Sequence, residues 1–131
     1  MNLEGGNVLG VGVDLTEVER IRSAHMKHGA VFLDKIYTPA EQQLCLAKAD
    51  PYPSLAARFA AKEAASKAFG TGIGAEFSLT SLGVLNGPEG EPLVELDDKA
   101  RALLSARGAS RLLLSLTHTD TLAQAFAVLV R

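Results

Sequence analysis

The sequence has little of several residue types that mark particular classes of protein. It carries one cysteine, Cys45, in 131 residues, which excludes an internal disulfide and a zinc site built on several thiolates. Tryptophan is absent and aromatic residues make up 5% of the chain, which disfavours a protein that stacks nucleic-acid bases on aromatic rings. The 13 lysines and arginines nearly balance the 15 aspartates and glutamates, so no overall basic charge favours nucleic acid or an anionic membrane.

Long apolar runs are also missing. No run approaches the roughly 20 residues that a membrane-spanning helix needs, and the N-terminal residues lack the basic stretch and apolar run of a secretory signal. Hydrophobic residues nevertheless make up 47% of the chain and charged residues 21%, which suits a packed core in a chain of one-domain size. We therefore predict a single cytoplasmic domain over residues 1–131, without a membrane or nucleic-acid partner.

Hydrophobic periodicity and turn residues predict a mixed fold. The predicted order is a strand, three helices, two strands, a helix and two strands. These elements are expected at residues 8–13, 16–28, 38 onward, 55–69, 79–85, 92–96, 97–108, 112–117 and 122–130. This order predicts an α+β domain with a mainly antiparallel sheet and helices packed on one face.

Several residues predict where helices begin and end. Thr38 and Glu41 form a capping box with proline at the first helical position. Ser54 is the expected cap of the next helix, which Gly70 closes. That helix carries alanines all round its cylinder, and since small residues allow close packing, we expect it at the centre of the fold. The alanines are at positions 56, 57, 60, 61, 64, 65 and 68.

Charged and polar side chains recur on this central helix at helical spacing. Arg58, Lys62 and Ser66 are four residues apart and stack in one row, and Glu63 and Lys67 form the adjacent row. One interpretation is an exposed cationic surface for phosphates that includes one carboxylate. The other is an ordinary solvated face with ion pairs along the helix, which the charge pattern favours when taken alone.

Two further polar residues stand at the ends of predicted strands. Asp14 either caps the turn that follows it or binds a metal, because carboxylates from Asp14 and Glu63 would suit Mg²⁺ if strand and helix pack together. His118 is either a hydrogen-bonded turn residue or a group for proton transfer or phosphate contact.

Residues 20–35 carry a local excess of basic side chains. Arg20, Arg22, Lys27 and Lys35 stand against Asp34 alone, which gives this stretch a charge of +3 in a chain of net −2. The excess is either ordinary variation of a surface or a docking patch for an acidic partner protein.

Three blocks of the sequence resemble one enzyme family. The first is GVGVDL at 10–15 with EVERI at 17–21, and the second is ARFAAKEA at 57–64 with KAFGTG at 67–72. The third is LSLTHT at 114–119. In this order and at this spacing, the blocks are similar to those of short, trimeric phosphopantetheinyl transferases of the holo-[acyl-carrier-protein] synthase type. The likeness covers nearly the whole chain, and the second block is the most specific.

The resemblance implies a defined reaction. Enzymes of this type transfer the 4′-phosphopantetheine arm of coenzyme A to a serine hydroxyl of apo acyl carrier protein, and they release adenosine 3′,5′-bisphosphate. They use Mg²⁺ and act as homotrimers with active sites at subunit interfaces. We therefore expect Mg²⁺ as cofactor, and coenzyme A, an apo acyl carrier protein and further copies of this chain as partners.

The family pattern also implies roles for residues of this chain. Asp14 and Glu63 fall at metal-binding positions, and Lys67 lies by the pyrophosphate. Arg20 matches an arginine that meets the carrier protein, and Lys27 belongs to the same basic stretch. The positions that resemble the coenzyme A site are Arg58, Lys62, Ser66, Lys67, Gly70 and His118.

The general base and the activity itself have alternatives. The proton of the carrier serine could pass to a water on the metal, to Glu63 or to His118. A non-catalytic module that binds coenzyme A or a nucleotide would share the cationic helix, as would a purely structural interaction domain. The presence of Asp14, Glu63 and Lys67 together favours the enzyme, because a non-catalytic module has no evident need for all three.

Overall fold

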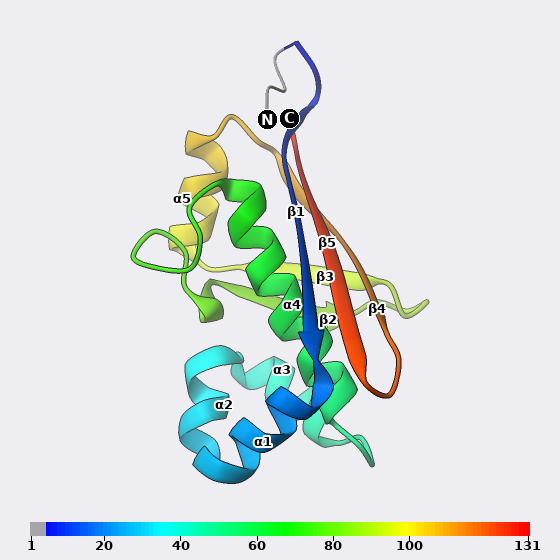
Figure 1. Ribbon diagram of the computed structural model, residues 1–131. Helices are drawn as coiled ribbons and strands as arrows, with labels where there is room; N and C mark the ends of the chain where they lie inside the picture. The colour runs from blue at the N-terminus through cyan, green and yellow to red at the C-terminus, as the bar shows by residue number, and fades with distance from the viewer. Residues whose placement is uncertain (1–4) are drawn as a thin grey trace.

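The structure, a computed structural model, describes residues 5–131, and residues 1–4 of the predicted domain lie outside the described part. Figure 1 labels the elements. In chain order they are β1 (Val8–Glu17), α1 (Val18–His28), α2 (Ala30–Ile36), α3 (Pro39–Leu46), α4 (Tyr52–Phe69), the 3-10 turn η1 (Leu79–Ser81), β2 (Leu82–Asn86), β3 (Pro92–Leu96), α5 (Asp98–Ala106), β4 (Arg111–His118) and β5 (Leu122–Val130).

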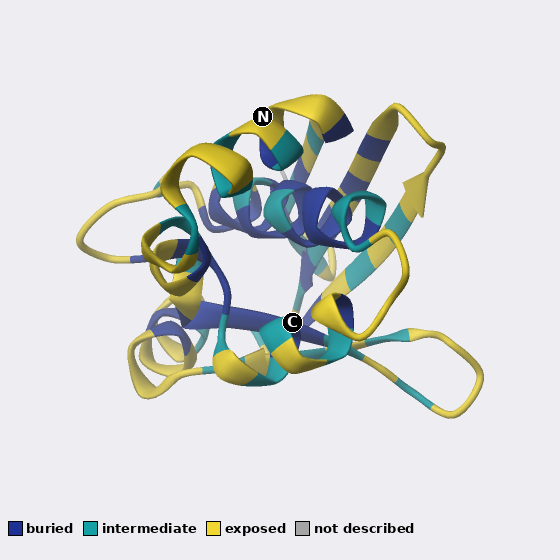
Figure 2. Ribbon diagram, turned by 90° about the horizontal axis from the view of Figure 1, so that it is seen from below, coloured by how far each residue is buried: buried dark blue, intermediate teal, exposed yellow. Residues whose placement is uncertain are grey.

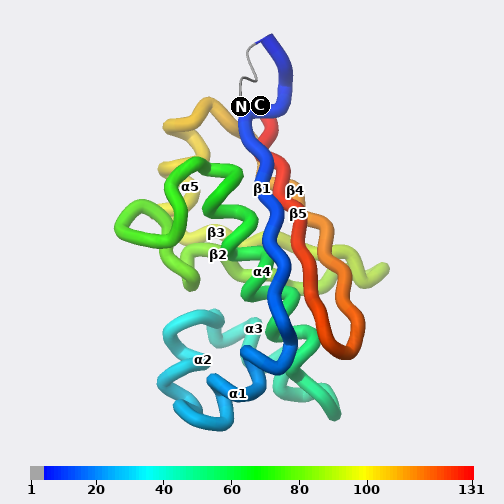
Figure 3. Tube along the Cα trace, viewed as in Figure 1, coloured from blue at the N-terminus to red at the C-terminus, as the bar shows by residue number. Residues whose placement is uncertain are grey.

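Two antiparallel sheets contact the long helix α4. Strands β1, β5 and β4 form a three-stranded sheet in that order, and β2 pairs with β3 in a hairpin. Figure 1 shows the helices gathered on one side of the three-stranded sheet. The predicted α+β class, with antiparallel strands and helices on one face, is confirmed. The start of the described part and the C-terminus lie at the same end of this sheet (Figure 3), where the Arg131 amide donates to the Asn7 oxygen at 2.8 Å.

The contact between β1 and α4 depends on missing side chains in β1. A Cβ atom on Gly10 would lie 2.0 Å from the carbonyl oxygen of Ala68, and one on Gly12 would lie 1.9 Å from that of Ala64. Only glycine allows so close an approach of two backbones. The seven alanines of α4 are all buried, which confirms the predicted central position of this helix.

The three-stranded sheet has one buried and one exposed face. In β5, Ala125, Ala127 and Leu129 are buried on the side of α4. The alternate residues face away, and Figure 2 shows strands that change from dark blue to yellow along their length. Large apolar side chains on this second side, which we call the outer sheet face, are 39–60% exposed. They are Val13, Leu15, Leu113, Leu122 and Phe126.

Four local predictions are wrong. Helix α2 was not expected, because it follows Gly29 without a side-chain cap that would mark its start. Helix α4 begins at Tyr52 rather than after a Ser54 cap, since Ser54 lies inside the helix and its hydroxyl accepts a bond from Arg58. Residues 79–81 form a 3-10 turn and not the start of a strand. The first helix begins at Val18 rather than at residue 16, because β1 runs on to Glu17 beside β5.

Three further helix boundaries follow their predicted signals. Thr38 Oγ1 accepts from the Glu41 amide at 3.2 Å, and Glu41 Oε1 accepts from the Thr38 amide at 3.0 Å, which completes the capping box. Asp97 caps α5 by accepting from the Ala100 amide at 2.8 Å. Gly70 ends α4 in the left-handed region with a φ of 81°.

Candidate active site

Asp14, Glu63 and Lys67 come together where β1 passes α4, and we call this group the carboxylate corner. Asp14 lies near the end of β1, and Glu63 and Lys67 are one turn apart on α4. The Lys67 ammonium donates to the backbone oxygen of Val13 at 2.8 Å and lies 3.5 Å from Asp14 Oδ1. A metal site shared by Asp14 and Glu63 required the strand and the helix to pack together, and β1 and α4 do so.

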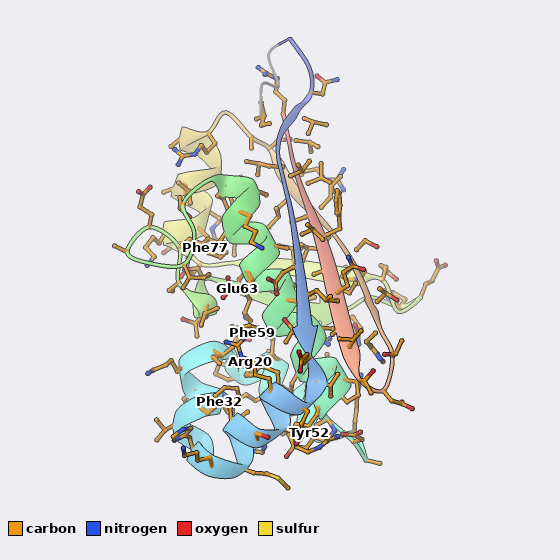
Figure 4. All side chains as sticks on the ribbon, viewed as in Figure 1. Arg20, Phe32, Tyr52, Phe59, Glu63 and Phe77 are labelled. Carbon is orange, nitrogen blue, oxygen red and sulfur yellow. The ribbon has the colours of Figure 1, made fainter. Side chains whose placement is uncertain are left out.

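The surroundings of Glu63 raise its pKa above the usual value of a glutamate. Partial burial is the main cause, and the like charge of Asp14 adds to it, whereas Lys67 and Arg20 act in the opposite direction. Figure 4 shows Glu63, Phe59 and Arg20 one after another between α4 and α1. The guanidinium of Arg20 lies 5.9 Å from the centre of the Phe59 ring. A raised carboxyl pKa beside a second carboxylate is typical of functional sites.

The donor atoms of the carboxylate corner fit a hard divalent cation. Asp14 Oδ2 accepts a hydrogen bond from Thr16 Oγ1 at 2.9 Å, which orients the carboxylate. Two carboxylates that repel each other are both relieved by a shared cation. Over residues 5–131, no group of three or more histidine, cysteine, aspartate or glutamate side chains could hold a metal ion. A pair of carboxylates suits Mg²⁺, since this ion takes one or two protein carboxylates and completes its shell with phosphate oxygens and water.

The row of Arg58, Lys62 and Ser66 on α4 is neither the exposed cationic surface nor the solvated face that its spacing left open. The exposure of Arg58 is 3%, that of Lys62 is 0% and that of Ser66 is 1%, so both interpretations are wrong. Arg58 Nε donates to the Val84 oxygen at 2.8 Å, and Lys62 Nζ donates to the Leu82 oxygen. The physical reason is the central position of α4, because this row faces β2, whose backbone oxygens accept from the cations.

Arg58 and His118 line a pocket of about 260 Å³ together with Lys48, Ser54 and Asn86, and we call it the arginine pocket. Ser54 Oγ accepts from Arg58 Nη1 at 2.7 Å and from Lys48 Nζ at 3.1 Å. Arg58 Nη2 donates to Asn86 Oδ1 at 3.3 Å. Two cations and a histidine around one hollow are groups that would suit an anion. None of the three residues of the carboxylate corner lines it.

Sequence reasoning missed Lys48 and Asn86. Lys48 follows α3 and Asn86 ends β2, so no spacing in the sequence connects either residue to Arg58. A local signal was present only for Ser54, which is four residues from Arg58 on the same helix.

Gly70 lies beside Lys67 in a second hollow of about 400 Å³, which Arg107 also lines. The Gly70 amide donates to the Lys67 oxygen at 3.0 Å, and the Thr71 amide donates to the Ser66 oxygen at 3.1 Å. The amides of this turn thus close the end of α4. A contact between Gly70 and coenzyme A stays a prediction.

The basic stretch lies on α1 and the segment after it. Arg20 and Lys27 are exposed, whereas Arg22 forms an ion pair with Glu19 one turn away. Met26 is 75% exposed beside Lys27, so the surface combines positive charge with an apolar side chain. Such a combination is suited to a partner that is acidic and partly apolar.

Comparison with known proteins decides the family. A family model described as the 4′-phosphopantetheinyl transferase superfamily matches residues 10–126, which include the carboxylate corner and the arginine pocket. The chain belongs to the 4′-phosphopantetheinyl transferase superfamily. The holo-[acyl-carrier-protein] synthase of Chlamydia muridarum is 44% identical over 121 residues, which are 92% of this chain and 94% of that protein. The superfamily member described here is thus an enzyme of the holo-[acyl-carrier-protein] synthase type, as the resemblance implied.

Solved structures agree with this assignment and with the fold. The crystal structure of holo-[acyl-carrier-protein] synthase from Neisseria meningitidis superposes with a TM-score of 0.88 at 33% identity, covering 95% of this chain and 99% of that chain. The Helicobacter pylori enzyme in complex with coenzyme A superposes with a TM-score of 0.80 at 30% identity, covering 91% and 98%. Over residues 5–131, none of the helices has the length and apolar character needed to cross a membrane.

Proposed function

We propose that this enzyme transfers the 4′-phosphopantetheine arm of coenzyme A to a serine of an apo acyl carrier protein and releases adenosine 3′,5′-bisphosphate. The observation that carries the proposal is the meeting of Asp14, Glu63 and Lys67 at one corner of β1 and α4. A reaction at a phosphoryl group needs positioning and charge stabilisation more than a covalent intermediate. Two carboxylates for a metal ion and an ammonium group provide those means.

Asp14 and Glu63 would hold Mg²⁺ in this proposal. The ion supplies positive charge that stabilises the diphosphate of coenzyme A. Thr16 orients the Asp14 carboxylate, and the rigid helix α4 carries Glu63. Because the pKa of Glu63 is raised, its carboxylate becomes available for the ion at a higher pH than an isolated glutamate would.

Lys67 would stabilise the departing phosphate. Its side chain is 53% exposed, so the ammonium can move from the Val13 oxygen to an incoming ligand without unpacking the core. Of the two side chains predicted as general bases, Glu63 belongs to the same corner as Lys67, whereas His118 lines the arginine pocket. Within one chain, this placement supports Glu63 over His118 as acceptor of the serine proton.

Coenzyme A has two phosphate centres, a diphosphate and a 3′-phosphate. The carboxylate corner suits the diphosphate together with a metal ion, and the arginine pocket, with Arg58, Lys48 and His118, suits the 3′-phosphate. Since the two groups line different parts of the chain, we place them on neighbouring copies. One complete site would then use the carboxylate corner of one copy and the arginine pocket of the next.

The outer sheet face supports assembly into the homotrimer that the resemblance implies. Exposed apolar patches of this kind mark protein interfaces. Val13 and Leu15 of this face flank Asp14 in β1, and Leu15 shares a hollow with His118. A second copy packed there would therefore lie close to residues of both phosphate sites.

The carrier protein would dock on α1, next to the carboxylate corner. Arg20 lies close enough to Glu63 to influence its pKa, and Lys27 is exposed further along the helix. A docking face that includes Arg20 would bring the carrier serine toward the metal ligands. The single domain over 1–131 and the cytoplasmic location, which rest on the composition and the lone Cys45, stay predictions.

Mass spectrometry of the carrier tests the proposed function. The enzyme is incubated with several apo acyl carrier proteins, coenzyme A and Mg²⁺, and the carrier is expected to gain one phosphopantetheine on a serine. The Asp14→Asn variant is the matched control and should give no gain. If the wild-type protein binds coenzyme A in calorimetry and yet modifies none of the carriers, the non-catalytic module replaces the transferase.

A further inference from the structure

Glu41 and Lys62 form an ion pair that no solvent reaches. Both side chains are 0% exposed, and Lys62 Nζ lies 2.7 Å from Glu41 Oε1. The two residues are 21 positions apart, on α3 and α4. An ion pair so deep in the core is costly to desolvate, and it persists only where further hydrogen bonds satisfy both charges.

The pair connects three elements by hydrogen bonds. Glu41 Oε1 also accepts from the Thr38 amide at 3.0 Å, and Glu41 Oε2 accepts from the Val84 amide at 2.9 Å. Lys62 Nζ donates to the Leu82 oxygen as well. The start of α3, the middle of α4 and strand β2 are therefore held together by two charged groups.

Lys62 immediately precedes Glu63, so its anchoring fixes the rotation of α4 about its own axis. Successive residues of a helix point about 100° apart, and here Lys62 faces β2 while Glu63 belongs to the corner at β1. On the β1 side the helix packs closely against Gly12, which has no side chain. Side-chain hydrogen bonds that resist rotation of α4 come from Arg58, Lys62 and Lys67, and those of Lys62 lie directly next to Glu63.

We propose that the buried Glu41–Lys62 pair is a positioning device that holds Glu63 opposite Asp14, and that Lys62 acts through the helix rather than by touching coenzyme A. This inference rests on the proposed function. Direct contact of Lys62 with a phosphate would require its ammonium to leave Glu41, which would strand a carboxylate in the core. Replacement of a buried pair by neutral groups of similar volume is often tolerated by the fold, so geometry can be separated from stability by experiment.

The test uses the double variant Glu41→Gln/Lys62→Met, which removes both charges and keeps one acceptor oxygen for either the Val84 or the Thr38 amide. Mn²⁺ affinity is measured by electron paramagnetic resonance on the protein without carrier, and coenzyme A affinity is measured by calorimetry without metal. Loss of a supporting group around a metal ligand typically costs about 10- to 100-fold in metal affinity. We expect a loss of that order for Mn²⁺, a matching fall in kcat and an unchanged affinity for coenzyme A.

Two results would overturn the inference. A folded double variant with wild-type Mn²⁺ affinity makes the pair purely structural, and a loss of coenzyme A affinity without metal makes Lys62 a ligand of coenzyme A. If the double variant does not fold, Glu41→Asp replaces it, because it keeps the negative charge on a shorter side chain. Wild-type Mn²⁺ affinity in Glu41→Asp would also make the pair purely structural. The control variant Asp98→Asn/Arg101→Met removes an exposed ion pair and should keep the wild-type affinities for Mn²⁺ and coenzyme A. Because the binding assays need no carrier, they stay informative if the transferase proposal fails.

Discussion

The ammonium of Lys67 lies 3.5 Å from the carboxylate of Asp14, although 53 positions separate the two residues in the chain. Their proximity follows from the contact of β1 with α4, in which Gly10 and Gly12 let the strand approach the helix backbone. The chemistry of the carboxylate corner therefore depends on the packing of β1 against α4. Substitutions of the charged residues and substitutions of the glycines should both affect this site.

Replacement of Lys67 should remove activity and leave the fold intact. We expect Lys67→Met to lower kcat/KM by about 10²–10³-fold, the usual effect of deleting one group that stabilises developing charge. Its thermal midpoint should stay near that of the wild type, because an exposed ion pair of this kind contributes little to stability. Lys99→Met is the control, since Lys99 is another exposed lysine that donates to a backbone oxygen, that of Ala75. Equal losses in both variants would contradict a role for Lys67 in the reaction.

Replacement of Glu63 should stabilise the metal-free protein while it removes activity. The pKa of Glu63 is raised in the folded state, so in the range above the ordinary value of a glutamate the folded chain binds more protons than the unfolded chain. Stability therefore falls as the pH rises through the raised pKa, and at neutral pH the charged carboxylate opposes folding. Glu63→Gln, measured with a chelator present, should unfold at a higher temperature than the wild type.

The same variant should lose its response to Mg²⁺. An ion that binds only the folded state raises the thermal midpoint of the wild type, and this rise should disappear in Glu63→Gln. Glu76→Gln, at an exposed position outside the corner, should keep the response. If Glu63→Gln, measured with a chelator present, unfolds at a lower temperature than the wild type, then burial and repulsion from Asp14 are not the dominant influences on this carboxyl.

A methyl group on Gly12 should disturb both fold and site. Its Cβ would lie 1.9 Å from the Ala64 oxygen and 2.9 Å from the Ala68 nitrogen, so β1 and α4 must separate. We expect Gly12→Ala to cost at least about 1–3 kcal/mol of unfolding free energy, as overpacked cores do. Urea denaturation measures this loss. Gly74→Ala is the control, because nothing lies within 4 Å of the added atom there, and a similar loss in both would exclude the helix contact as its cause.

Mixing of two inactive variants should restore activity if each site uses two copies of the chain. Asp14→Asn lacks a working carboxylate corner and His118→Ala has an impaired arginine pocket, so chains that are unfolded and refolded together can combine an intact corner with an intact pocket. In a ring of head-to-tail interfaces assembled at random from equal amounts, half of the corners and half of the pockets are intact. About a quarter of the sites then combine both, which predicts recovery to about a quarter of the wild-type rate. Asp14→Asn mixed with Glu63→Gln should stay inactive, because both changes affect the same corner. Failure of the first mixture would place the complete site within one chain.

Features with a local cause were predictable from the sequence. The capping box at Thr38 and Glu41, the cap at Asp97 and the turn at Gly70 depend on residues that are neighbours in the chain. The alanines of α4 indicated close packing before any partner was known. The meeting of Asp14 and Glu63 could be stated only as a condition, since two distant elements had to pack.

Features that depend on distant partners were not predictable. Charges four residues apart on a helix usually indicate a solvated face, and nothing near Lys62 in the sequence indicates its partner Glu41 in another helix. The position of Lys48 in the arginine pocket was unpredictable for the same reason. Lys48 follows α3, and it and Arg58 both donate to the hydroxyl of Ser54. Burial of most of α4 is a property of the assembled fold, and it changes an apparent surface row into an internal one.

The outer sheet face has a consequence for how turnover depends on the amount of enzyme. Val13, Leu15 and Phe126 meet water in a lone chain, and association that covers them is subject to mass action. Under the proposed assembly, the rate per chain falls on dilution below the dissociation constant of the oligomer and recovers on concentration. A cell that makes little of this protein would then hold most of it as idle subunits, so the level of expression would set both the quantity of catalyst and the fraction that works.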